Sequence, residues 1–161
     1  MTQLTKTIRE LAADLAAGRI TSMALTQQML ARAEAHRAQG GHAYVSLDGE
    51  QALAEARASD AARAAGIVAS PLAGVPISIK DLFDVRGQVS SAASLALADA
   101  PPAAADAGAV ARLRAAGAVL LGRTNMSEFA FSGLGLNPHH GTPRHPLDRE
   151  RVAGGSTSGG A

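Results

Sequence analysis

Residues 74–81 are Gly-Val-Pro-Ile-Ser-Ile-Lys-Asp, and this stretch is central to the predicted fold. Val75, Ile77 and Ile79 are β-branched residues, which favour extended backbone and suit a strand that is buried on both faces. The stretch therefore predicts a buried strand that ends at Lys80 and Asp81.

A helix followed by a strand is predicted further along the chain. Residues 107–116 have the pattern of a helix, which we expect Asp106 to cap and Gly117 to end. Residues 118–122 then supply a second buried strand, and residues 44–47 a short third one. The alternation predicts an α/β fold, in which a mixed β-sheet is covered by helices on both faces.

Three more helices are predicted before the first buried strand. Residues 7–17 begin with Thr7 and Glu10 in capping-box spacing, residues 21–39 begin at Thr21 or Ser22, and residues 51–65 are rich in alanine. Residues 89–105 have no clear periodicity and predict a long loop with one helical turn at most. A further helical turn is expected near residues 124–129, with Asn125 as its cap.

The composition excludes several classes of protein. The 161 residues suffice for one domain, and the net charge of +1 comes from scattered residues, so no nucleic-acid surface is expected. Without cysteine there is no disulfide and no thiolate nucleophile. The N-terminus lacks a secretory signal pattern, and no run approaches the roughly 18 apolar residues of a membrane span, so we expect a cytoplasmic protein without membrane contact.

Lys80 is the first candidate for chemistry. A lysine held in apolar surroundings binds its proton less tightly, as a general base requires. The ordinary alternative is a surface lysine that pairs with Asp81 or Asp84, and a Lys-Asp pair taken alone favours that alternative.

The second candidate is the glycine-rich segment 154–160, Gly-Gly-Ser-Thr-Ser-Gly-Gly. Its amides and three hydroxyls are suited to surround a carbonyl group or an anion. A flexible linker has the same composition, whereas a Walker A nucleotide site would need a lysine that is absent here.

Three histidines, His139, His140 and His145, lie close together in the sequence. Zinc sites usually space two histidines by three to five residues and add further Cys, His or carboxylate ligands, but only Asp148 or Glu150 is near. We therefore predict a solvated loop and no metal site.

Segments 74–81, 122–129 and 154–159 occur in an order that resembles the amidase-signature family. The resemblance covers nearly the whole chain, including residues 134–138 and 141–144. It implies a hydrolase of small-molecule amides that needs no cofactor and no metal and uses a Ser-cisSer-Lys triad. It equally admits the A subunit of a glutamine-dependent aminoacyl-tRNA amidotransferase, which needs a partner subunit.

Within this resemblance, Lys80 matches the family's lysine and Ser156 its cis-serine. Neutral Lys80 would take a proton through Ser156 from a nucleophilic serine. The supporting loop would consist of Gly154, Gly155, Thr157, Ser158 and Gly159.

The family's nucleophile belongs to a second glycine-rich segment, which we expect beyond Ala161. Residues 1–161 are thus predicted to be the N-terminal part of a single amidase-signature domain that ends in the cis-serine loop and is inactive by itself. Thr157 and Arg123 replace the family's usual Ser and Lys and keep a hydroxyl and a charge. A non-catalytic scaffold or binding fragment stays open, as do the amide substrate and the oligomeric state, with a homodimer as one option.

Overall fold

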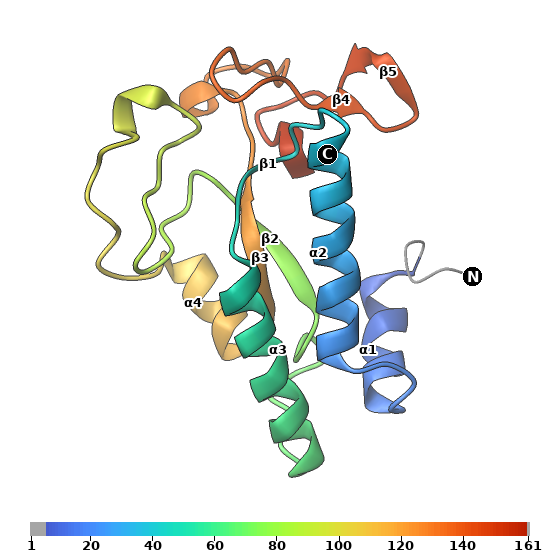
Figure 1. The fold of residues 1–161 in the computed structure, drawn as a ribbon. Helices are drawn as coiled ribbons and strands as arrows, with labels where there is room; N and C mark the ends of the chain where they lie inside the picture. The colour runs from blue at the N-terminus through green and yellow to red at the C-terminus, as the bar shows by residue number, and fades with distance from the viewer. Residues whose placement is uncertain (1–5, 161) are drawn as a thin grey trace.

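The computed structural model describes residues 6–160 and has an α/β architecture (Figure 1). Strands β1 (Tyr44–Leu47), β3 (Val119–Thr124) and β2 (Pro76–Lys80) form a sheet in the order β1-β3-β2. The central strand β3 pairs antiparallel with β1 and parallel with β2. The predicted mixed sheet is confirmed.

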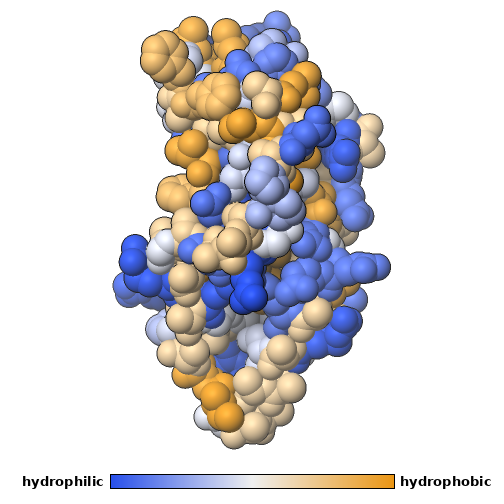
Figure 2. All heavy atoms as spheres, turned by 90° about the vertical axis from the view of Figure 1, so that its left-hand side faces the viewer, coloured by the Kyte–Doolittle hydropathy of each residue, from blue (hydrophilic) through white to orange (hydrophobic). Residues whose placement is uncertain are grey.

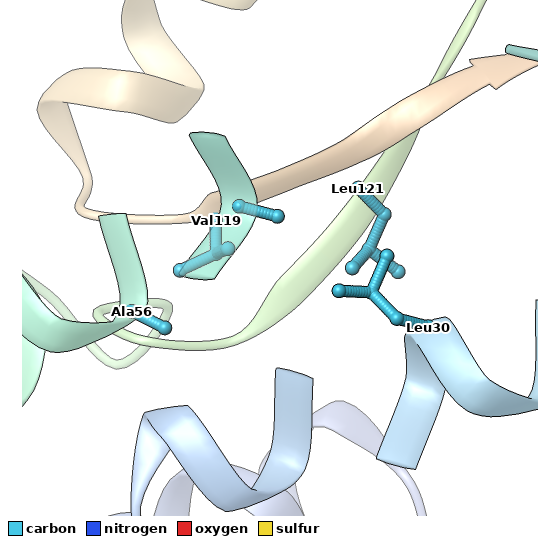
Figure 3. Packing of buried hydrophobic residues seen from close by; sticks show 5 residues of the cluster. Leu30, Ala56, Val119 and Leu121 are labelled. Atoms are coloured by element: carbon cyan, nitrogen blue, oxygen red, sulfur yellow. The ribbon is translucent and has the colours of Figure 1, made fainter. Parts of the chain in front are cut away.

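One face of the sheet is covered by helices α2 (Ser22–Ala38) and α3 (Gly49–Ala64). Leu30 of α2 and Ala56 of α3 pack in one cluster with Val119 and Leu121 of β3 (Figure 3). Because alternate residues of a strand point to opposite faces, Val119 and Leu121 both belong to this face.

Helix α4 (Gly108–Ala115) covers the opposite face. Leu120, which lies between the two residues just described, packs instead with Val110 of α4 and with Ile79 and Val85. All six residues of β3 are therefore buried, and the prediction of helices on both faces is correct.

The N-terminal helices form as their caps predict. Thr7 and Glu10 make the expected capping box at the start of α1 (Ile8–Ala16), and the hydroxyl of Thr21 caps α2. Leu15 of α1 packs against Leu25 of α2 and against Val75, which precedes β2. This contact fixes the helix pair beside the strand that carries Lys80.

Two predicted caps are wrong. Helix α4 starts after Ala107 with no side-chain cap, because the Asp106 carboxylate accepts a hydrogen bond from the backbone N–H of Arg86 at 2.8 Å and pairs with Arg114. Asn125 does not cap a helix either, because its side-chain amide donates to the carbonyl oxygens of His42 and Gly141. Both polar side chains bind backbone groups of distant segments, and neither caps the first turn of the adjacent helix.

The remaining segments are mostly irregular. The long loop before α4 contains the short 3-10 helix η2 (Leu95–Leu97), in line with the expected single turn. Near the C-terminal end, β4 (Arg144–His145) and β5 (Asp148–Val152) form a two-stranded ribbon that the loop-like composition did not predict. The 3-10 turns η3 (Glu128–Ala130) and η4 (Ser158–Gly160) flank this ribbon in the chain. Within residues 6–160, no helix combines the length and the apolar character that a membrane crossing requires.

Candidate active site

The two sequence-predicted site residues meet at one edge of the sheet. Lys80 is the last residue of β2 and lies beside Thr124, the last residue of β3, because the two strands are parallel. The turn η4 contacts both strands, so the glycine-rich loop returns to this carboxyl edge. Carboxyl edges of parallel strands are where α/β proteins commonly place their ligands.

Lys80 lies next to two hydroxyls of the glycine-rich loop. Its Nζ atom is 2.6 Å from Ser156 Oγ and 3.0 Å from Thr157 Oγ1. Burial lowers the pKa of Lys80 below the ordinary lysine value. An amine that loses its proton readily, within hydrogen-bond distance of a hydroxyl, can accept the proton of that hydroxyl.

Asp81 is not the partner of Lys80. Its buried carboxylate accepts hydrogen bonds from Arg123 Nε at 3.0 Å, from Ser91 Oγ at 2.6 Å and from the backbone N–H of Ala93 at 2.8 Å. The surface Lys-Asp pair that an isolated motif would favour is therefore not formed by these two residues.

Arg123 lies next to the site, and the sequence did not predict its contacts. Its side chain is 3% exposed, and it also donates to Ser90 Oγ at 3.1 Å. The Asp81–Arg123 pair thus joins the ends of β2 and β3 to the loop around residues 90–93. This network holds the strand end from which Lys80 projects.

Backbone hydrogen bonds connect the glycine-rich loop to the segment that follows β3. The backbone N–H of Ser127 donates to the carbonyl of Ser156 at 3.1 Å, and that of Gly159 donates to the carbonyl of Asn125 at 2.8 Å. The Gly155–Ser156 peptide bond is cis. These contacts hold the Ser156 backbone beside Lys80.

Two glycines of the loop are required by close backbone approach. A Cβ atom at Gly155 would lie 2.6 Å from the backbone nitrogen of Gly135, and one at Gly159 would lie 2.1 Å from the carbonyl oxygen of Ala43. Neither distance is compatible with a side chain, so these positions admit only glycine without a backbone shift.

Ser158, the third hydroxyl of the loop, lies apart from Lys80. The residue is 2% exposed and borders a separate cavity, with its Oγ atom lacking a hydrogen-bond partner among the described residues. The structure therefore brings Lys80, Ser156 and Thr157 together and directs Ser158 elsewhere.

The three histidines that are close in the sequence have different surroundings. His139 Nε2 lies 3.0 Å from Glu128 Oε1. The pKa of Glu128 is lowered, first by a hydrogen bond from the Ser94 side chain and then by the electrostatic attraction of His139. His145 belongs to β4. Across residues 6–160, no three His, Cys, Asp or Glu side chains gather in a way that could hold a metal ion.

Several large exposed apolar side chains lie at the same end of the molecule as the loops around the site. Figure 2 shows apolar atoms concentrated at the upper end of one face, and η2 and the segment after β3 lie at that end in Figure 1. The large exposed apolar residues of these segments are Leu95, Leu97, Phe129, Phe131, Leu134 and Leu136. A patch of this kind is typical of a surface that contacts other protein segments.

The fold and the site together define the general class of this protein. It is an α/β protein in which a half-buried lysine lies beside a serine hydroxyl at the carboxyl edge of the sheet. Comparison with known proteins narrows the class. The family model Amidase matches residues 24–161, and the chain belongs to the amidase-signature family. Members of this family include amidases, which hydrolyse C–N bonds. The resemblance predicted from the sequence is confirmed.

Similar proteins include both enzymes and enzyme subunits. The A subunit of glutamyl-tRNA(Gln) amidotransferase from Cupriavidus necator is 45% identical over 154 residues, which are 96% of this chain and 30% of that protein. AtzE, a 1-carboxybiuret hydrolase subunit from a Pseudomonas species, is 52% identical over 110 residues, which are 68% of this chain and 24% of that protein. The chain thus spans about 30% or less of the length of these relatives.

Solved structures agree with this assignment. The peptide amidase from Stenotrophomonas maltophilia superimposes with a TM-score of 0.88 at 37% identity, over 98% of this chain and 33% of that one. A chain from a vestigial protein complex that reveals the origins of an s-triazine catabolic enzyme gives a TM-score of 0.90 at 42% identity, over 96% of this chain and 34% of that one.

Proposed function

We propose that the protein containing these residues hydrolyses the C–N bond of a linear carboxamide by a Ser-cisSer-Lys mechanism. The observation that carries the proposal is the 2.6 Å distance between Lys80 Nζ and Ser156 Oγ. The lowered pKa of Lys80, caused by burial, supports its role as the base. Thr157 Oγ1, 3.0 Å from the same nitrogen, helps to orient the amine.

In this mechanism the proton moves through Ser156. Neutral Lys80 accepts the proton of Ser156 Oγ while that oxygen accepts the proton of a nucleophilic serine, whose oxygen attacks the amide carbonyl. The lysine ammonium then returns a proton through Ser156 to the leaving nitrogen as the C–N bond breaks. Water removes the acyl group from the nucleophilic serine by the same relay, which restores neutral Lys80.

Under the same proposal, residues 1–161 form the N-terminal part of a single amidase-signature domain, and the nucleophilic serine lies in a later segment. Two observations support this part. The chain spans about a third of the length of its relatives, and the other serine of the loop, Ser158, borders a separate cavity. The apolar end of the molecule is suited to contact with further segments of such a domain.

The test uses the complete polypeptide that contains these residues. Lys80→Ala and Ser156→Ala should each lower kcat/KM for a carboxamide by about 10²–10⁴-fold, because each removes a proton-transfer group. Lys6→Ala is the matched control, since Lys6 pairs with Asp14 in the N-terminal region and should leave activity unchanged. Full activity of the Lys80→Ala protein would refute the proposal.

The 45% identity to the A subunit of an amidotransferase favours a second candidate within the family. In that case the protein releases ammonia from glutamine only together with a partner subunit. Glutaminase activity that appears when the partner is added identifies an amidotransferase component, whereas amide hydrolysis without it identifies a free-standing amidase. A non-catalytic scaffold would fail to react with an activated-serine probe even as the complete polypeptide.

A further inference from the structure

A second cavity lies between three segments that are distant in the sequence. It has a volume of about 240 Å³ and is bordered by the end of α2, by the β4–β5 ribbon and by the glycine-rich loop at Ser158 and Gly159. Figure 1 shows the ribbon beside the upper end of α2. Neither Lys80 nor Ser156 borders this space, which we call the α2–ribbon cavity.

The lining of the α2–ribbon cavity is basic. Its titratable side chains are His36, His42, Arg144, His145 and Arg149. Among the residues that the structure describes, no carboxylate is part of the lining. Within the ribbon, Asp148 pairs with Arg151, and the ion pairs formed among residues 6–160 include neither Arg144 nor Arg149. Arg144 and Arg149 are therefore not engaged in ion pairs within the described part of the chain.

One of these side chains presents a defined hydrogen-bond donor. His145 Nδ1 accepts the backbone N–H of Leu147 at 3.2 Å, so the neutral ring carries its proton on Nε2 and can donate it. Ser158 also borders the cavity, but its Oγ atom is buried and is not a donor to an occupant.

We propose that the α2–ribbon cavity binds a tetrahedral oxyanion, namely a phosphate group. Its basic side chains come from the end of α2, from the segment that follows α2 and from the β4–β5 ribbon, so they approach from several directions. A phosphate group offers acceptor oxygens in several directions, whereas a carboxylate offers two in one plane. Because Ser158 is two residues from Ser156, an occupant would contact the loop that carries the proposed relay. This binding site is additional to the proposed amide hydrolysis.

The probe is inorganic phosphate, titrated into the complete protein by calorimetry at constant ionic strength. We expect saturable binding at one site. Arg149→Gln should weaken binding by about tenfold or more, because it removes one charge-assisted donor. Arg149 is exposed, so its replacement leaves the fold intact, which a circular dichroism spectrum verifies.

Arg151→Gln is the matched control. Arg151 lies on the same ribbon, but it pairs with Asp148 and does not border the cavity. An equal loss of phosphate affinity in Arg151→Gln and Arg149→Gln would mean diffuse attraction and would overturn the proposal. Non-saturable binding, or acetate binding as tight as that of phosphate, would overturn it as well.

Discussion

Replacement of Asp81 by asparagine tests whether the buried pair with Arg123 holds the site together. The Arg123 and Asp81 side chains are 3% and 2% exposed, and the pair joins Arg123 Nε to Asp81 Oδ1 at 3.0 Å. Asp81→Asn leaves the Arg123 charge buried without a counter-charge. Removal of one partner of a buried ion pair costs about 3–5 kcal/mol, and we expect that loss in the free energy of unfolding.

The exposed pair between Arg151 and Asp148 is the matched control. It joins the same atom types at 2.9 Å, but its side chains are 78% and 44% exposed. Exposed pairs contribute about 0–1 kcal/mol, so Asp148→Asn should change stability by no more than that. The contrast between the two substitutions therefore isolates the effect of burial.

Urea unfolding followed by circular dichroism measures both variants. With the usual dependence of about 1–3 kcal/mol per molar urea, Asp81→Asn should lower the unfolding midpoint by roughly 1–5 M, and Asp148→Asn by much less. A loss in Asp81→Asn as small as that of the surface control would refute the reasoning. Arg123 would then have found water or another partner.

Three other predictions concern the base, the core and the loop. Because burial lowers the pKa of folded Lys80 below its ordinary value of 10.5, unfolding takes up a proton, so stability should rise with pH between the lowered pKa and 10.5. Lys80→Met should remove that rise in pH-dependent urea titrations, and an unchanged slope would contradict the burial of the amine. Leu121→Ala should destabilise by about 2–5 kcal/mol through a cavity between β3 and α2, while Leu147→Ala, at a residue 91% exposed, should have almost no effect in the same unfolding assay. Gly159→Ala places a Cβ atom 2.1 Å from a backbone oxygen and should lower activity of the complete protein by about a hundredfold, because it displaces the loop. Gly160→Ala, whose nearest contact would be 3.3 Å, is the control, and equal activity of the two variants would show that the loop tolerates the shift.

Much of the fold follows from local sequence patterns. The branched run before Lys80 and the Ala118–Gly122 run both form strands, and Thr7 and Thr21 cap the helices that they were expected to cap. These features depend on residues within a few positions of each other, so propensity and spacing are sufficient to predict them.

The local prediction is wrong for two polar side chains that were expected to cap helices. Asp106 and Asn125 have the residue type and the position of caps, but both bind backbone groups of other segments. A cap bond and a tertiary bond have similar strength, so the surrounding fold decides between them. The sequence could not show which backbone groups the fold would leave without a partner.

The sequence by itself determined the family, the mixed sheet with helices on both faces, and the choice of Lys80 and Ser156 as the residues to examine. Only the tertiary structure decided that their side chains lie 2.6 Å apart, although they are 76 positions apart in the chain. The structure alone also decided that Asp81 pairs with Arg123, and that basic residues of α2 and the β4–β5 ribbon border one cavity. The physical reason is that a sequence pattern records neighbours along the chain, whereas proton transfer and charge compensation depend on distances set by packing of remote segments.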